Sequence, residues 1–278
     1  EDGLLYGRGA VDAKGSFCAA VAAASRLPPE VRSSLSLLLI GAVEEEAPSS
    51  KGAHHALANY SRPDCLIIGE PSGWDAMTLG YKGRFVARVT LEKDNFHSAG
   101  SGPTAAEELV DLWLRVKGWA NAFNEDKTGM FDSLQVALQE ISSRNDGLMQ
   151  GADATLGLRL PPTMAPQQAE TILRSLLGPA STLTFDGHVP ACRAAKDTIL
   201  SRAFRSAIRQ QAGVPRFKLK TGTSDMNLAA QTWDVPMLAY GPGDSTLDHR
   251  PDEHLDLAEY ERSIRVLQAA FAALAGRA

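Results

Sequence analysis

The apolar positions of this chain follow two different patterns. Toward both ends, short and nearly continuous apolar runs stand at residues 35–43, 65–69 and 235–240. Runs of this kind are typical of strands covered on both faces, as in parallel sheets. Segments with helical spacing separate the runs. The outer parts of the chain therefore predict an α/β fold with a mostly parallel sheet and helices on both faces.

The helices expected in these parts cover residues 16–27, 52–60, 197–212 and 257–274. The first is small and apolar throughout and is followed by Pro28 and Pro29, so we expect a buried helix that ends before the prolines. The last has the clearest pattern, because its apolar residues recur at three- and four-residue spacing: Leu257, Tyr260, Ile264, Leu267, Phe271 and Leu274.

The middle of the chain alternates instead. In residues 82–91, Phe85, Ala87 and Val89 point one way, and Arg84 and Arg88 point the other. This is the pattern of a strand with one wet face. Further strands are expected at residues 133–141 and 154–160, and amphipathic helices at residues 104–123 and 166–177. We expect a smaller α+β domain at residues 82–190, inserted into a domain formed by residues 1–81 and 191–278.

The composition excludes several classes of protein. The 278 residues carry a net charge of −5 and are 44% hydrophobic, which predicts a sizeable core and no nucleic-acid partner. No apolar run approaches the roughly 18 residues of a membrane span. Cys18, Cys65 and Cys192 are far apart and odd in number, as expected of a reduced, cytoplasmic protein. The chain begins at Glu1 without Met, so we expect that an upstream segment is missing.

A glycine-rich turn at residues 6–15 holds one carboxylate, Asp12, just before the first helix. Gly7, Gly9 and Gly15 allow backbone conformations that other residues avoid. An acid on such a turn is well placed to bind a metal ion. Taken alone, Asp12 is more simply explained as a helix cap.

Other acids follow the buried runs at equivalent positions. Glu44, Glu45 and Glu46 follow residues 35–43, and Glu70 follows residues 65–69. Ligands of open α/β sheets bind at this end of the strands, and adjacent carboxylates are tolerable beside a cation or a proton. His249 lies among acids after residues 235–240. A histidine in this setting can be a metal ligand that a neighbouring carboxylate orients. A solvated acidic turn and a loop histidine are the simpler readings. Oxygen ligands with a histidine suit Zn²⁺, Co²⁺ or Mn²⁺, and this number of acids suggests two ions.

Residues 7–15, 44–46, 69–72 and 220–227 and the His249 loop resemble, in this order, a known family. They are similar to motifs of the dinuclear zinc amidohydrolases that include acetylornithine deacetylase, succinyl-diaminopimelate desuccinylase and glutamate carboxypeptidase. The resemblance implies two divalent ions, Zn²⁺ or Co²⁺, in a catalytic domain of residues 1–81 and 191–278. It makes residues 82–190 a dimerisation or lid domain and the protein a homodimer.

The resemblance also implies roles for single residues. Asp12 matches the bridging metal ligand, and its peptide bond to Ala13 is expected to be cis. Glu45 matches the general base and Glu46 a metal ligand, although a slip of one residue gives Glu44 and Glu45 instead. Glu70 and His249 match further metal ligands, whereas Asp225 is better explained as a helix cap.

In the inserted domain, His97 matches a histidine that stabilises the oxyanion in the active site of the neighbouring subunit. Substrate contacts are matched by Lys82, Asn145, Arg159, Gly222 and Thr223, of which Asn145 and Arg159 correspond to residues that grip a carboxylate. The family also has a His-x-Asp motif upstream of Asp12, before the start of this chain. The number of ions that the chain holds without that motif, two, one or none, stays open.

The reaction implied is metal-dependent hydrolysis of a linear amide. The closest resemblance within the family is to enzymes of lysine and arginine biosynthesis that release lysine or ornithine from the terminal glutamate of a small acidic amino-group carrier protein. The alternatives are an N-acetyl-amino-acid deacetylase or desuccinylase, an aminoacyl peptidase, and a metal-free binding protein that keeps the fold without catalysis.

Overall fold

The computed structural model describes residues 2–47, 49–97, 100 and 102–276. The chain divides into two compact units. Unit 1 comprises Glu1–Gly80, Arg193–Lys220 and Ser224–Ala278, and unit 2 comprises Tyr81–Cys192 with the short segment Thr221–Thr223. Unit 2 thus interrupts unit 1 in the sequence.

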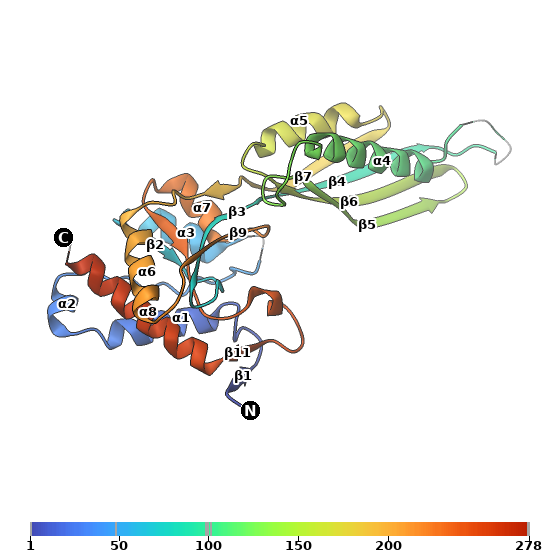
Figure 1. Cartoon of the computed structure of the whole chain (residues 1–278). Helices are drawn as coiled ribbons and strands as arrows, with labels where there is room; N and C mark the ends of the chain where they lie inside the picture. Colours follow the sequence, from blue (N-terminus) through green and yellow to red (C-terminus); the bar gives the residue numbers. More distant parts are fainter. Residues whose placement is uncertain (1, 48, 98–99, 101, 277–278) are drawn as a thin grey trace. The chain divides into compact units, whose positions relative to one another are not determined.

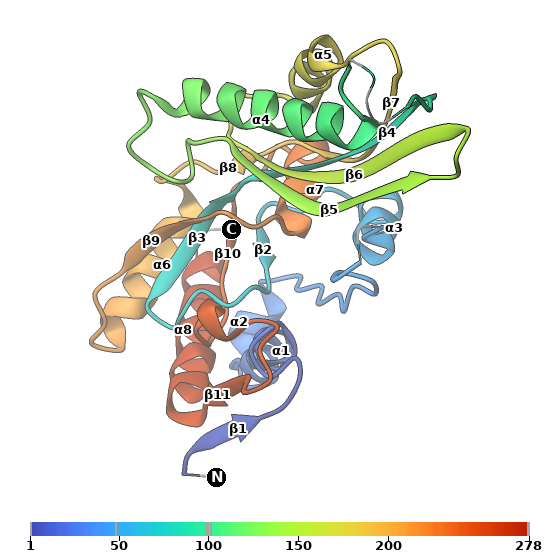
Figure 2. The ribbon, with the colours of Figure 1, turned by 90° about the vertical axis from the view of Figure 1, so that its right-hand side faces the viewer.

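The sheet of unit 1 is mixed. Its strand order is β2 (Leu66–Ile68), β10 (Met237–Ala239), β3 (Ala76–Tyr81) and β8 (Cys192–Arg193), and β9 (Arg216–Lys220) also pairs with β3. β2 runs parallel to β10, whereas β3 runs antiparallel to it (Figure 2). The α/β class is confirmed, but the sheet is parallel only in part.

The helices of unit 1 fall into two groups. α1 (Lys14–Ser25), α6 (Ile199–Gln210) and α8 (Leu257–Ala275) form one core with β3 and β10. The short α2 (Pro29–Ser33) lies at the end of α8, and α3 (Lys51–Asn59) packs against α7 (Asp225–Thr232) (Figure 1). All four helices predicted here are present. α1 is not buried all round, because Phe17 and Val21 are exposed.

A segment near the start of the chain and the segment just before α8 pair in a small sheet. β1 (Leu4–Tyr6) pairs antiparallel with β11 (His254–Asp256), so that Leu5 lies opposite Leu255. A short 3-10 helix, η1 (Ser245–Leu247), precedes the loop that leads to β11. This pairing brings the glycine-rich turn after β1 next to the loop that carries His249.

The strand expected at residues 35–43 is not formed. The segment has no regular secondary structure, and Leu38 is 60% exposed and Val43 67% exposed. A strand forms only where a neighbouring strand pairs with its N–H and C=O groups. In the described part of the chain no strand pairs with this segment. The prediction of a strand rested on the apolar composition of residues 35–43. That composition favours burial but does not specify a strand with which the segment can pair.

Unit 2 is a four-stranded antiparallel sheet with two helices (Figure 1). The strand order is β5 (Gln135–Asn145), β6 (Met149–Leu160), β4 (Gly83–Asp94) and β7 (Ser181–Val189). α4 (Ala105–Asn124) and α5 (Pro166–Leu176) pack on the apolar face of the sheet, where Phe85, Leu156 and Leu109 are buried. Thr104 and Glu107 form a capping box that starts α4.

The strands and helices predicted in this unit are confirmed, whereas β7 was not predicted. Among the described residues, no helix of either unit combines the length and the apolar character needed to cross a bilayer.

Candidate metal centre

Asp12 stands at the end of the glycine-rich turn, directly before α1. The N-cap of α1 is Ala13, which has no side-chain cap, so Asp12 does not have the role of a helix cap. The Asp12–Ala13 peptide bond is cis, as the family resemblance leads one to expect. The Asp12 carboxylate points to His249, with 3.2 Å between Oδ2 and the imidazole Nε2.

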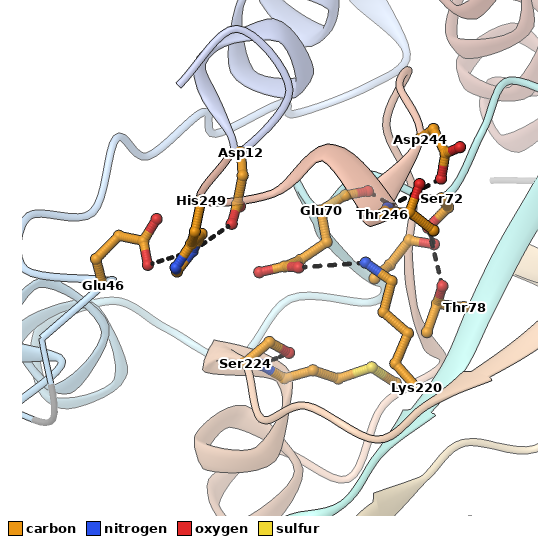
Figure 3. Close-up of polar contacts among 12 residues, drawn as sticks. Asp12, Glu46, Glu70, Ser72, Thr78, Lys220, Ser224, Asp244, Thr246 and His249 are labelled. Carbon is orange, nitrogen blue, oxygen red and sulfur yellow. Dashed lines mark hydrogen bonds and ion pairs between the residues drawn. The ribbon is translucent and has the colours of Figure 1, made fainter. Parts of the chain in front are cut away.

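His249 lies between two carboxylates from distant parts of the chain (Figure 3). Its Nε2 is 3.2 Å from Asp12 Oδ2 and 3.0 Å from Glu46 Oε2. One possible ligand atom from each of these residues lies within 4.8 Å of the other two. Two carboxylate oxygens and one imidazole nitrogen at this spacing form a possible metal site.

The three consecutive glutamates point to different surroundings. Glu44 turns outward, where its carboxylate accepts from Ser49 at 2.6 Å and Lys51 at 3.0 Å. Glu46 faces His249, with Arg8 at 4.0 Å on its other side. Glu45 lies between them and is partly buried.

Burial raises the pKa of Glu45 to about 7, and the charges of Asp225, Asp12 and Glu46 add to the effect. Burial contributes more to this rise than the neighbouring acids do. A hydrogen bond with Glu70 opposes the rise. A carboxyl group with this pKa can both accept and release a proton near neutral pH.

Glu70 follows β2 and is largely buried, with 12% of its side chain exposed. Burial raises its pKa to about 8, although Lys220, at 3.8 Å, acts in the opposite direction. Asp12 and Glu45 raise the pKa further. Glu70 therefore interacts with the acids of the site but is not part of the group formed by Asp12, Glu46 and His249. In Figure 3 its carboxylate points toward Lys220.

Two aspartates join the site without having been predicted as site residues. Asp225 is not the cap of α7, because Ser224 holds that position and accepts from Met226 N. Asp225 Oδ1 and Asp248 Oδ1 are both buried without a hydrogen-bond partner in the described part of the structure. Burial, and next the charge of Asp12, raises the pKa of Asp248 to about 7. The only sequence signal for Asp248 was its position next to His249.

The donor set fits a divalent cation. Burial, and the negative charge of neighbouring acids such as Asp12, raise the pKa values of Glu45, Glu70 and Asp248. A cation would reduce the repulsion among these acids and would give the unpaired oxygens of Asp225 and Asp248 a partner. Carboxylate oxygens with one imidazole suit Zn²⁺, Co²⁺ and Mn²⁺.

The candidate substrate residues of unit 2 lie at its two ends. Lys82 is fully buried, and its ammonium group donates to Met130 O at 2.9 Å, to Gln135 Oε1 at 3.0 Å and to Ser133 O. Direct contact between Lys82 and a substrate would replace one of these partners. Burial lowers the pKa of Lys82 to about 8, and the charge of Arg159 lowers it further.

Arg159 lies near Lys82 and directly opposite Arg84 on the neighbouring strand. Its guanidinium donates to Thr223 Oγ1 at 2.9 Å, and Thr223 donates to the carbonyl of Lys82 at 2.9 Å. Burial and the charge of Arg84 lower the pKa of Arg159. A Cβ added at Gly222 would meet no atom within 4 Å. This end of unit 2 is therefore cationic.

His97 and Asn145 lie at the other end. His97 is exposed just after β4. Asn145 is the last residue of β5; it lies opposite Gln150 and bonds to Asn95 at 3.2 Å. Gln150 and Arg159 are nine positions apart in β6, which is roughly 30 Å along a strand. Within one chain, Asn145 and Arg159 are thus too far apart to hold the same carboxylate.

Known proteins resemble this chain over almost all of its length. The chain is 57% identical to "[LysW]-lysine hydrolase" of Deinococcus radiodurans, over 99% of this chain and 77% of that protein. It is 37% identical to "Putative [LysW]-lysine/[LysW]-ornithine hydrolase" of Thermococcus kodakarensis, over 96% of this chain and 69% of that protein.

Solved structures share the fold. A metallo-carboxypeptidase of Sulfolobus solfataricus, Sso-CP2, matches with a TM-score of 0.74 at 16% identity, over 99% of this chain and 78% of that one. The dipeptidase Dug1p of Saccharomyces cerevisiae matches with a TM-score of 0.68 at 14% identity, over 99% and 73%. Residues 1–273 also match the sequence model of peptidase family M20/M25/M40. The chain therefore belongs to peptidase family M20/M25/M40, a family of metal-dependent hydrolases.

Proposed function

We propose that this chain hydrolyses the amide bond that joins lysine, or ornithine, to the terminal glutamate of a small acidic amino-group carrier protein. The observation that carries amide hydrolysis is the meeting of Asp12, Glu46 and His249 beside the partly buried Glu45. The substrate is inferred from the relative that is 57% identical over nearly the whole chain. As a biosynthetic enzyme with no disulfide among its three cysteines, it is assigned to the cytoplasm.

Two divalent ions, Zn²⁺ or Co²⁺, are part of this proposal. Asp12 would be shared between them, with Glu46, Glu70 and His249 as further ligands. The ions supply positive charge that polarises the substrate carbonyl and favours the loss of a proton from water. Glu70 can serve as a metal ligand if its carboxylate contacts the cation in place of Lys220, which lies 3.8 Å away.

Glu45 is the proposed general base. The outward position of Glu44 and the contact of Glu46 with His249 support the assignment of Glu45 as base and Glu46 as ligand. Glu45 takes a proton from water as the water attacks the carbonyl carbon. It then gives that proton to the amino group of the departing lysine, which completes cleavage of the C–N bond. A pKa of about 7 suits both transfers.

Unit 2 is the proposed dimerisation and lid domain. Arg159, with Arg84 opposite it, is suited to a carboxylate of the substrate. His97 and Asn145 lie at the far end of the same sheet, roughly 30 Å away. This separation supports a two-fold homodimer in which His97 and Asn145 of each chain serve the active site of the partner chain.

The test is turnover of defined substrates by the protein loaded with Zn²⁺ or Co²⁺. Carrier protein linked to lysine, the same carrier linked to ornithine, and N-acetyl-lysine are compared, with the released amino acid measured by mass spectrometry. Release from the carrier, and loss of release in Glu45→Gln, is the expected result. Hydrolysis of N-acetyl-lysine alone would instead identify a small-molecule deacetylase. Binding of the carrier protein without metal uptake or turnover would identify a metal-free binding protein.

A further inference from the structure

Glu253 connects the two segments that supply Asp12 and His249. It lies just before β11 and is only 3% exposed. Its carboxylate accepts from the backbone N–H of Gly9 at 3.0 Å, of Val11 at 2.9 Å and of Asp12 at 3.1 Å. Its own carbonyl accepts from Gly7 N at 3.1 Å. One residue therefore binds the backbone of the glycine-rich turn at four points.

These hydrogen bonds account for the burial of an acid in this place. A buried carboxylate is costly unless several donors satisfy its oxygens. Burial alone would raise the pKa of Glu253, but the N–H groups of Gly9, Asp12 and Val11 outweigh it, so that the pKa is lowered. Both oxygens of Glu253 already accept hydrogen bonds from the turn, Oε2 from Gly9 and Oε1 from Val11 and Asp12. The residue is thus engaged with the backbone rather than directed at the metal site.

The turn depends on Glu253 for its shape. Gly9 has a φ of +80°, a conformation that side-chain-bearing residues rarely adopt, and the chain reverses here before α1. Inside the turn, Val11 is fully buried against Leu255. The apolar contact fixes Val11, and the three N–H bonds fix the backbone on either side of it. The direction of the Asp12 carboxylate follows from that backbone.

Glu253 also belongs to the segment that carries His249. Its N–H bonds to Arg250 O at 3.2 Å, so the two residues share one short loop. This loop supplies one possible metal ligand and also holds the turn that supplies another. The hydrogen bonds of Glu253 to the turn and to Arg250 therefore determine the distance between Asp12 and His249.

We propose that Glu253 is a positioning residue for metal binding: it holds the Gly9–Asp12 turn so that the Asp12 carboxylate faces His249 and Glu46. The proposal rests on the proposed function in one respect, since it takes Asp12 to be a metal ligand. Carboxylates that orient ligands without touching the metal typically change its affinity 10- to 100-fold when they are replaced.

The experiment compares Glu253→Gln with a matched control in the same strand region. Glu253→Gln keeps the size of the side chain but replaces one acceptor oxygen with an NH₂ group, which faces N–H donors. Asp256→Asn is the control, because Asp256 accepts from Ala258 N at 2.7 Å and Glu259 N at 2.9 Å, away from the turn. Co²⁺ is titrated into each metal-free full-length variant, and the affinity, the visible absorption spectrum and the melting temperature are measured.

We expect Glu253→Gln to bind Co²⁺ about 10- to 100-fold more weakly, with an altered absorption spectrum. Asp256→Asn should keep the affinity and spectrum of the wild type even where its melting temperature falls by a similar amount. Wild-type binding by Glu253→Gln, or an equal loss in Asp256→Asn, would overturn the proposal. If Glu253→Gln does not fold, Glu253→Asp takes its place in the same comparison.

A further variant separates this proposal from the proposed function. Asp12→Asn should lose Co²⁺ affinity whether or not Glu253 positions the turn. Wild-type binding by Asp12→Asn would remove Asp12 from the ligands, and the role of Glu253 with it. Loss of affinity in Asp12→Asn but not in Glu253→Gln would leave the metal site standing and refute the positioning role alone.

Discussion

The imidazole Nε2 of His249 lies 3.2 Å from Asp12 Oδ2, although 237 positions separate the two residues in the sequence. Glu46 Oε2 lies 3.0 Å from the same nitrogen. An imidazole and two carboxylates in this arrangement can share a cation. The consequences for metal binding can be tested one residue at a time.

Removal of the imidazole should weaken metal binding. His249→Ala is expected to bind Zn²⁺ or Co²⁺ at least about 10-fold more weakly, because one of the three grouped ligand atoms is lost. Isothermal titration calorimetry on metal-free protein measures the change. His254→Ala is the control, since the His254 ring contacts the ring of Tyr6, with ring centres 5.0 Å apart, and is not one of the grouped ligands. Equal losses in both variants would contradict the site.

The two possible assignments of the glutamates predict opposite results. Glu45→Gln should lower kcat by about 10²- to 10⁴-fold, the usual contribution of a general base, while metal affinity is retained. Glu44→Gln should leave kcat within about twofold, because Glu44 is exposed and paired with Lys51. Steady-state kinetics on the carrier-linked substrate measure both. A large loss in Glu44→Gln would favour the assignment shifted by one residue.

Lys82 should make the stability of unit 2 depend on pH. The unfolded chain keeps the lysine proton up to about pH 10.4, whereas the folded chain releases it near pH 8. Between these values the unfolded state binds more protons, so the contribution of Lys82 to stability rises with pH, by at most about 3 kcal/mol.

The measurement for Lys82 is urea unfolding of the wild type and of Lys82→Met from pH 7 to pH 10.5. The difference in unfolding free energy between the two proteins should move in favour of the wild type as the pH rises. Because other groups titrate in both proteins, only this difference carries information. A difference that stays constant over the range would show that the lysine pKa is not lowered by folding.

Mixed dimers test whether His97 acts in the partner chain. His97→Ala and Glu45→Gln should each be inactive. Unfolding and refolding them together in equal amounts should restore about a quarter of wild-type activity, because half of the dimers then contain one intact site. Sedimentation velocity provides the assembly state. An active monomer, or a mixture without restored activity, would contradict the arrangement.

The sequence predicted most elements whose apolar pattern is long and regular. The helix spacing of residues 257–274 corresponds to α8, and the alternation of residues 82–91 corresponds to β4. Residues 35–43 show the limit of this reasoning. Their apolar run resembles a buried strand, but no backbone partner in the described structure pairs with them. β7 was missed because Gly187 interrupts the apolar side of its alternation, which leaves only Leu183, Phe185 and Val189 as apolar positions.

Some residues of the candidate site could be predicted and others could not, because contacts that depend on the backbone leave no signal in the sequence. Asp12, Glu46 and His249 belong to motifs with recognisable neighbours, so their types and positions suggested a shared chemistry. Glu253 has no such signal. Its role depends on the backbone N–H groups of a turn that lies 241 positions away from it, and the identity of the residues in that turn does not encode the contact. Asp225 was wrongly assigned to the helix cap, because the neighbouring Ser224 suits that position equally well and occupies it.

The contact between Glu253 and the glycine-rich turn has a consequence for folding. It closes a loop that includes nearly the whole chain, since its partners Gly9 and Glu253 are 244 positions apart. Closure of a long loop costs little more stability than closure of a shorter one, but contacts of large sequence separation form slowly. The helices and the hairpins of unit 2 can form from local contacts before this closure. During refolding, the ability to bind Co²⁺ should therefore appear after most of the helical circular dichroism signal has returned.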